Sequence, residues 1–172
     1  DLHYCETAEP YVFFPSRVED AKRQELLVRA MSLTTTPVYA VFAGMGGQLE
    51  TMRTLAATLG VGSRVRFLGH VSREEKLAWY AHASMVFFGP FDEDYGYVTL
   101  EAFLSHKPVI TATDSGGTLE FVVDGVNGFV CAPDPADIGR AIGRLAADRT
   151  LAARLGDAGW ARAREVTWDG VV

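Results

Sequence analysis

The sequence has little of what marks several protein classes. Its two cysteines, Cys5 and Cys131, are too few for a disulfide framework and lack metal-ligand spacing. No apolar run approaches the roughly 20 residues that span a bilayer, and no basic-then-apolar signal peptide opens the chain. We therefore expect a cytoplasmic protein without a transmembrane segment, and an extracellular mini-domain or a zinc module is disfavoured.

Basic charge is also scarce. Lys plus Arg number 16 against 22 Asp plus Glu, which gives a formal net charge of −6. Nucleic-acid-binding domains usually carry a basic excess, so we expect no nucleic-acid partner. An anionic ligand would have to be held by a few local cations or backbone amides. The four histidines show no helical metal spacing and no hydrolase triad order, so we expect no metal site.

The composition, with 48% hydrophobic and 22% charged residues, favours a single α/β domain that covers residues 1–172. Short runs rich in Val, Phe and Ile alternate with longer amphipathic stretches. This alternation predicts a Rossmann-like, doubly wound parallel sheet of about six strands with helices on both faces, in an undetermined strand order. The expected strands are residues 11–15, 38–44, 64–69, 85–89, 108–111 and 128–131. The expected helices are residues 20–33, 48–59, 72–83, 96–105, 118–123, 135–147 and 150–166.

Three local patterns support these helix boundaries. Ser72 with Glu75 three residues later fits a capping box at a helix start. Asp134 before a proline predicts a helix N-cap, and Gly60 predicts a helix stop.

Ligands of such sheets bind outside the carboxyl ends of the strands, which makes the loop of residues 16–22 a first candidate. Arg17 and Lys22 bracket a predicted helix start there. A helix N-terminus with two cations is suited to phosphate. The alternative is a pair of solvated cations that neutralise Glu19 and Asp20.

Two glycine-rich loops are less specific. Residues 44–47 resemble part of a dinucleotide fingerprint, but Leu49 stands where the third glycine is required. Either close backbone packing or a ligand at the bare backbone would explain that loop. Gly116 and Gly117 precede another predicted helix, and they fit a tight turn or exposed ligand-binding amides equally well.

Two acidic residues with seven residues between them lie in the loop and helix that follow residue 89. Glu93 would lie in the loop and Glu101 one to two turns into the helix. The helix N-terminus between them would offer free amides to a diphosphate, and each carboxylate could accept sugar hydroxyls. The alternative is an acidic run that complements the helix macrodipole, but this does not account for Glu101.

Taken together, these loops resemble the C-terminal, nucleotide-sugar-binding half of retaining GT-B glycosyltransferases, specifically glycosyltransferase family 4. The resemblance extends from about Tyr11 to Trp168, and its six pieces occur in register. They are residues 16–22, 41–46, 65–71, the Glu93 to Glu101 element, 107–110 and 116–120. One departure is that Asp94-Tyr95-Gly96 follows the first Glu, where the family often has Pro-Phe-Gly.

The resemblance implies a function for each matching residue. The catalytic residues would be Arg17 and Lys22, which bind the donor diphosphate and stabilise the departing nucleotide, and Glu93, which contacts the donor sugar. Glu101 would hold the ribose hydroxyls. The remaining donor-binding residues would be Gly46, Val71, Lys76, Gly96, Tyr97 and Val98. The family uses no metal or other cofactor and retains anomeric configuration, with a front-face mechanism favoured.

The resemblance also implies partners. A nucleotide-diphosphate sugar would be the hexosyl donor. The family's N-terminal acceptor-binding domain is missing, so we expect a piece of a longer enzyme that is inactive alone and could contact a membrane surface through that absent domain. Two alternatives stay open: a GT-B sugar-nucleotide epimerase and a non-catalytic nucleotide-binding module.

Overall fold

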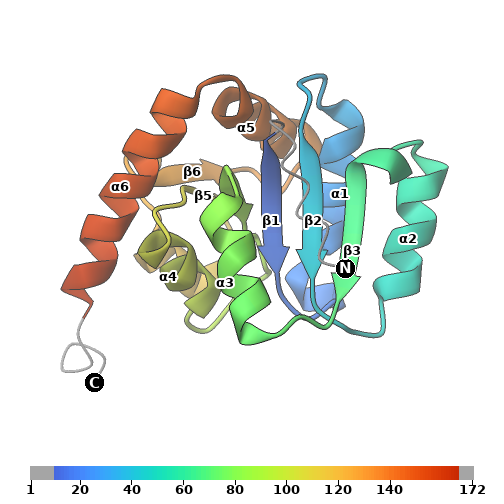
Figure 1. Cartoon of the computed structure of the whole chain (residues 1–172), viewed down its shortest axis with the longest axis horizontal. Helices are drawn as coiled ribbons and strands as arrows, with labels where there is room; N and C mark the ends of the chain where they lie inside the picture. The colour runs from blue at the N-terminus through green and yellow to red at the C-terminus, as the bar shows by residue number, and fades with distance from the viewer. Residues whose placement is uncertain (1–9, 167–172) are drawn as a thin grey trace.

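A six-stranded, wholly parallel sheet forms the centre of the computed structural model, which describes residues 10–166 (Figure 1). Cys5 and Trp168 lie outside the described residues. The strand order is β3-β2-β1-β4-β5-β6, so the chain moves outward from β1 twice, in opposite directions. The predicted doubly wound fold class is confirmed. The strands are β1 (Tyr11–Pro15), β2 (Tyr39–Ala43), β3 (Val65–Gly69), β4 (Met85–Phe87), β5 (Val109–Ala112) and β6 (Gly128–Cys131).

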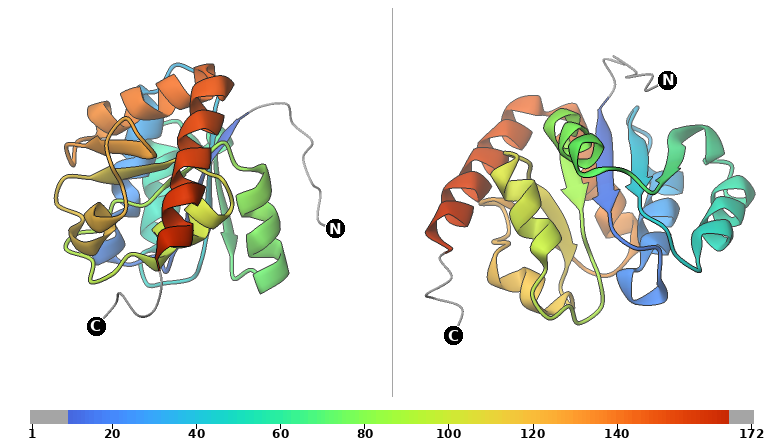
Figure 2. Two further views of the ribbon diagram at one scale, coloured as in Figure 1. Left: turned by 90° about the vertical axis from the view of Figure 1, so that its left-hand side faces the viewer. Right: turned by 60° about the horizontal axis from the view of Figure 1, so that its bottom comes forward.

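Helices cover both faces of this sheet. The left-hand view of Figure 2 shows α3 on one side and α5 on the other, with α6 toward the viewer. The α-helices are α1 (Gln24–Leu33), α2 (Leu49–Thr58), α3 (Arg73–His82), α4 (Tyr97–Leu104), α5 (Pro135–Ala147) and α6 (Arg149–Glu165). Three short 3₁₀ turns are η1 (Asp20–Lys22), η2 (Gly62–Arg64) and η3 (Gly116–Glu120).

Two of the predicted helices are wrong in detail. The helix expected over residues 20–33 is divided, because Arg23 adopts φ +54° in the left-handed region between η1 and α1. The helix expected over residues 118–123 is instead the 3₁₀ turn η3. The capping predictions are confirmed: Ser72 and Glu75 form a reciprocal capping box, Asp134 caps α5, and Gly60 follows α2 at φ +70°.

The core has one layer on each face of the sheet. Side chains of α1, α2 and α5 pack on one face, and side chains of α3 and α4 pack on the other. The long helix α6 contributes to both, since Leu155 belongs to the first layer and Ala163 to the second. Its Gly159 lies against the ring of Phe103, where a Cβ would come within 2.3 Å, so α6 approaches α4 very closely.

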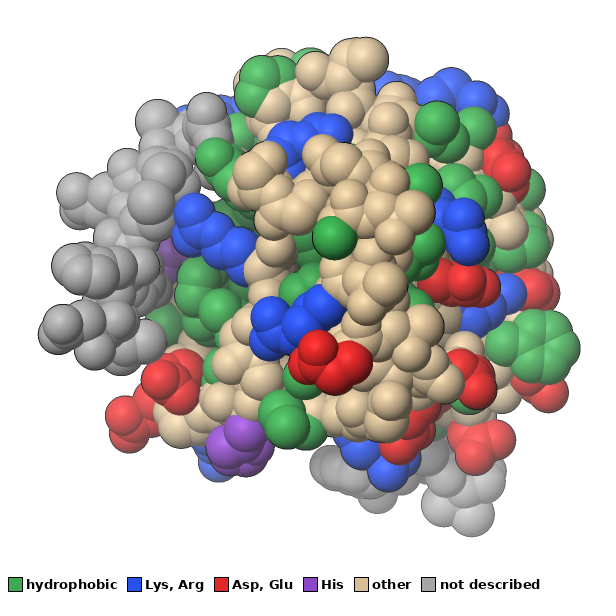
Figure 3. All heavy atoms as spheres, turned by 90° about the vertical axis from the view of Figure 1, so that its right-hand side faces the viewer, with side chains coloured by type: hydrophobic (Ala, Val, Ile, Leu, Met, Phe, Trp, Pro, Cys, Tyr) green, Lys and Arg blue, Asp and Glu red, His purple; other side chains and the backbone are tan. Residues whose placement is uncertain are grey.

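The surface of the described residues is of mixed charge. Figure 3 looks onto the side with α2 and β3, where the coloured side chains in view intersperse blue and red. Within residues 10–166, every helix falls short of the length or the hydropathy that crossing a bilayer requires.

Burial raises the pKa of the Cys131 thiol to about 11, so this cysteine stays protonated at neutral pH.

Candidate functional site

The loops that follow β1 and β2 are locked together at the carboxyl edge of the sheet, at the bottom of Figure 1. A Cβ on Gly44 would lie 2.0 Å from the carbonyl oxygen of Ser16, and one on Gly46 would lie 2.1 Å from that of Val18. The Val18 amide also donates to the Met45 carbonyl at 3.0 Å. Close backbone packing therefore explains these two glycines, and a donor-binding function for Gly46 stays a prediction.

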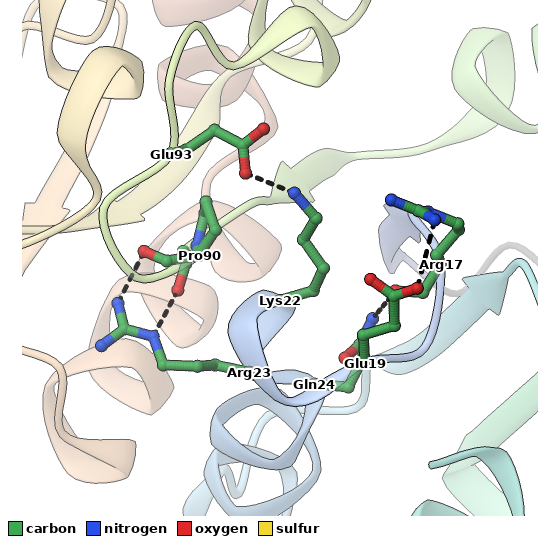
Figure 4. A network of polar contacts seen from close by, with 8 residues as sticks. Arg17, Glu19, Lys22, Arg23, Gln24, Pro90 and Glu93 are labelled. Carbon is green, nitrogen blue, oxygen red and sulfur yellow. Dashed lines mark hydrogen bonds and ion pairs between the residues drawn. The ribbon is translucent and has the colours of Figure 1, made fainter. Parts of the chain in front are cut away.

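Arg17 and Lys22 both lie in the loop after β1, but their surroundings differ (Figure 4). Arg17 is largely exposed and forms an ion pair with Glu19 at 3.3 Å. Lys22 is mostly buried, with an exposed side-chain fraction of 18%, and its ammonium pairs with the Glu93 carboxylate from the loop after β4. The structure thus brings together two of the three predicted catalytic residues, which are 71 residues apart in the chain.

Arg23, which sequence analysis missed, connects the loops after β1, β4 and β5 by hydrogen bonds. Its guanidinium donates to the carbonyl oxygens of Gly89 at 2.9 Å and Pro90 at 2.8 Å (Figure 4). It also forms a bidentate pair with the Asp114 carboxylate at 2.9 and 2.7 Å. These hydrogen bonds from Arg23 hold the pKa of Asp114 below its usual range. The segment that carries Glu93 is therefore tied to the loops after β1 and β5.

The glycine pair after β5, Gly116 and Gly117, contacts the backbone of the acidic loop that contains Glu93. The Gly117 amide donates to the Glu93 carbonyl at 2.6 Å, and a Cβ on Gly117 would lie 2.3 Å from the carbonyl oxygen of Asp94. A Cβ on Gly116, whose φ is +59°, would lie 2.5 Å from the Glu93 carbonyl oxygen. The pair thus forms a tight turn that lets the backbone near Glu93 approach closely.

The N-terminus of α4 follows directly on this loop. Gly96 is its N-cap, with φ +74°, and a Cβ there would lie 2.8 Å from the Thr118 hydroxyl oxygen. The first amides of a helix have no intrahelical partners. In α4 these are the amides of Tyr97 and Val98. The Tyr97 side chain is 60% exposed, whereas Val98 packs partly into the core. The arrangement offers backbone amides beside Glu93.

Glu101 lies in α4 and meets two side chains of α3. Its carboxylate accepts from Lys76 Nζ at 2.7 Å and from the Tyr80 hydroxyl at 2.9 Å. Lys76 and Glu101 are thus neighbours, although 25 residues separate them in the chain. Val71, just before α3, is half-buried and packs against the second core layer.

The side chains and amides described above are of the kinds that bind anions and hydroxyl groups. Cations at Arg17 and Lys22, amides at the start of α4, and carboxylates at Glu93 and Glu101 come from loops and a helix near one edge of the sheet. Among residues 10–166, no group of three or more His, Cys, Asp and Glu side chains is placed to hold a metal ion. That a ligand needs no metal here stays a prediction.

Comparison with known proteins covers almost the whole chain. The family model of glycosyl transferases group 1 matches residues 5–162. The D-inositol 3-phosphate glycosyltransferase of Streptomyces griseus is 34% identical over 91% of this chain and 36% of that protein. Human alpha-1,3/1,6-mannosyltransferase ALG2 is 34% identical over 67% of this chain and 28% of its own length. The chain thus spans about a third of these curated relatives.

Solved structures agree with the fold. Anabaena HepE in complex with UDP and glucose superposes with a TM-score of 0.84 at 28% identity, over 91% of this chain and 44% of that one. Sucrose-phosphate synthase of Thermosynechococcus elongatus gives a TM-score of 0.86 at 28% identity, over 95% and 43% of the two chains. With its fold and the family match over residues 5–162, the chain belongs to the glycosyl transferases group 1, on a GT-B-type domain.

Proposed function

We propose that the chain is the donor-binding half of a retaining glycosyltransferase, which transfers a hexosyl group from a nucleotide-diphosphate sugar to an acceptor. The single observation that carries this proposal is the Lys22–Glu93 ion pair beside the N-terminus of α4. It places a cation suited to binding phosphate next to a carboxylate suited to accepting sugar hydroxyls. The similarity to HepE, whose structure contains UDP and glucose, supports this choice of ligand.

Lys22 and Arg17 would bind the diphosphate. The Lys22 ammonium is mostly shielded from solvent, so its attraction to phosphate is less weakened by water than that of an exposed lysine. Arg17 is exposed, and within residues 10–166 its guanidinium pairs with the nearby Glu19, so it can turn toward an incoming anion. Negative charge develops on the diphosphate as the glycosidic bond breaks, and fixed cations and amides stabilise that charge.

Glu93 and Glu101 would bind the two sugars of the donor. In the structure Glu93 neutralises Lys22, so the diphosphate would replace the carboxylate as the partner of Lys22. The released carboxylate could then accept hydroxyls of the transferred hexose. Glu101, farther along α4, would accept the ribose hydroxyls, with Lys76 and Val71 near the base.

The acceptor would be held by a further domain, since the chain spans about a third of its curated relatives. Cations and amides of this chain would carry out the charge stabilisation that a metal performs in other transferases. The transfer reaction therefore requires no metal or other cofactor under this proposal, and it takes place in the cytoplasm.

Calorimetric titration with UDP, GDP and ADP, with and without magnesium, tests the proposal. We expect saturable binding of one diphosphate that does not depend on magnesium and is weakened by Lys22→Met. A control variant is Lys107→Met, which changes a lysine near the amino end of β5, away from the site. Absence of binding to all three nucleotides, or equal affinities for wild type and Lys22→Met, would contradict the donor-site assignment.

A further inference from the structure

The Glu101 carboxylate is held by two side chains of one neighbouring helix. The Tyr80 hydroxyl donates to Glu101 Oε2 at 2.9 Å, and Lys76 Nζ donates to Oε1 at 2.7 Å. Tyr80 and Lys76 are four residues apart on α3, so they lie on the same face of that helix. Both oxygens of the carboxylate are therefore engaged from the same side.

The two partners of Glu101 differ greatly in how freely their side chains can move. Tyr80 is completely buried, and its ring packs edge-on against Phe13 with 5.0 Å between the ring centroids. Burial and the nearby Glu101 charge raise the pKa of Tyr80, which keeps its hydroxyl a donor at neutral pH. Lys76 is partly exposed, on a flexible four-carbon stem. Tyr80 is thus the fixed support, and Lys76 the adjustable one.

We propose that Tyr80 is a positioning residue, which orients the Glu101 carboxylate so that it accepts both hydroxyls of the donor ribose. This inference rests on the proposed function. A carboxylate has about four acceptor positions, of which Tyr80 and Lys76 occupy two. The two that remain match a vicinal diol, which offers two donors. Glu101 itself is 42% exposed, so its free positions can be reached by a ligand.

The contribution of Tyr80 lies in restricting one rotation. The terminal torsion of a glutamate side chain is broad, so an unsupported carboxylate samples many orientations. The buried hydroxyl selects one of them before the ligand arrives, which lowers the entropic cost of binding the diol. Lys76 restricts this rotation less, because its partly exposed ammonium sits on a flexible stem.

The test compares a nucleoside diphosphate with its 2′,3′-dideoxy analogue, starting with UDP and using the matching pair if GDP or ADP binds more tightly. Tyr80→Phe removes only the hydroxyl. We expect it to weaken binding of the ribonucleotide by about tenfold, the scale of a hydrogen bond to a charged group. Binding of the dideoxy analogue and of inorganic pyrophosphate should be unchanged, because neither has a ribose diol.

Tyr11→Phe provides a matched control. The Tyr11 hydroxyl also donates to α3, but its acceptor there is the Trp79 backbone carbonyl, at 2.6 Å. This variant should retain the preference for the ribonucleotide. Glu101→Gln should lose that preference as Tyr80→Phe does, and the two changes combined should cost less than the sum of both.

Each outcome of this comparison decides between the hypotheses. Equal loss of affinity for the ribonucleotide, the dideoxy analogue and pyrophosphate in Tyr80→Phe would mean that Tyr80 only maintains the fold, and would overturn the inference alone. Unchanged affinity for the ribonucleotide would overturn it as well. If the wild-type chain binds no diphosphate and no pyrophosphate, the proposed function fails, and the inference fails with it.

Discussion

The contact between Gly117 and the acidic loop predicts the effect of adding one methyl group. In Gly117→Ala the new Cβ would meet the Asp94 carbonyl oxygen at 2.3 Å and the Asp94 carbonyl carbon at 2.8 Å. Carbon–oxygen contacts need about 3.3 Å or more, so the two backbones must separate by about 1 Å. This separation also lengthens the 2.6 Å hydrogen bond from the Gly117 amide to the Glu93 carbonyl.

We expect Gly117→Ala to cost about 1–3 kcal/mol of unfolding free energy, as overpacking does. Each kcal/mol lowers the Tm of a domain of this size by about 2–4 °C, which thermal unfolding followed by circular dichroism will resolve. Displacement of Glu93 should also weaken binding of a nucleotide sugar by about tenfold, since one charged hydrogen bond to the hexose is lost. The bare nucleoside diphosphate should bind almost as before, because it lacks the hexose.

Gly62→Ala is the control for this experiment. Within the part of the chain that the structure describes, a Cβ at Gly62 would meet no atom closer than 4 Å outside its own local backbone and chain neighbours. The reasoning is refuted if the two variants unfold at the same temperature and bind the nucleotide sugar equally well. Equal weakening of the nucleotide sugar and the bare nucleotide in Gly117→Ala would show that the loop shift reaches the phosphate site instead.

Four further variants probe the charges and the core. Lys22→Met should weaken pyrophosphate binding by about tenfold in calorimetry, whereas Glu93→Gln should strengthen it by releasing Lys22; a loss in both would contradict the exchange of partners. Asp114→Asn should be less stable than wild type at neutral pH. Arg23 lowers the folded-state pKa of Asp114, so the urea-unfolding difference should shrink below about pH 4; a difference that grows would contradict this sign. Leu27→Ala, at a fully buried position, should cost about 2–5 kcal/mol in urea unfolding, and a cost below about 1 kcal/mol would contradict its place in the core.

The fold class could be predicted because its evidence is local. Apolar strands and capped helices alternate along the chain, and each cap or helix stop that was predicted, at Ser72, Asp134 and Gly60, is formed by residues close in sequence. The division of the first helix could not be predicted. Arg23 adopts a left-handed conformation that glycine or asparagine would have indicated. In that conformation its side chain donates to Gly89, Pro90 and Asp114, all distant in sequence.

The candidate site was predicted as a set of loops but not as a set of contacts. Topology brings the carboxyl ends of parallel strands to one edge, which is sufficient to group Lys22 with Glu93. Which charged groups pair there depends on side-chain reach across more than 70 residues of sequence. The alternative in which Arg17 and Lys22 neutralise Glu19 and Asp20 holds for one cation, since Arg17 pairs with Glu19. Lys22 pairs with Glu93 instead. The contact of Tyr80 with Glu101 could not be predicted, because sequence does not distinguish a tyrosine in an amphipathic helix from any other core residue.

The close packing of α6 on α4 predicts that the two helices open as one cooperative unit. With eight residues, α4 is too short to persist by its own helical propensity. Its place is fixed by α6, whose Gly156 approaches the His106 carbonyl and whose Gly159 approaches the Phe103 ring. Local opening of α6 would therefore release α4, and hydrogen exchange should show the amides of both helices exchanging together. Truncation within α6 would therefore displace Glu101, which lies in α4, although every residue of the candidate site remained in the chain.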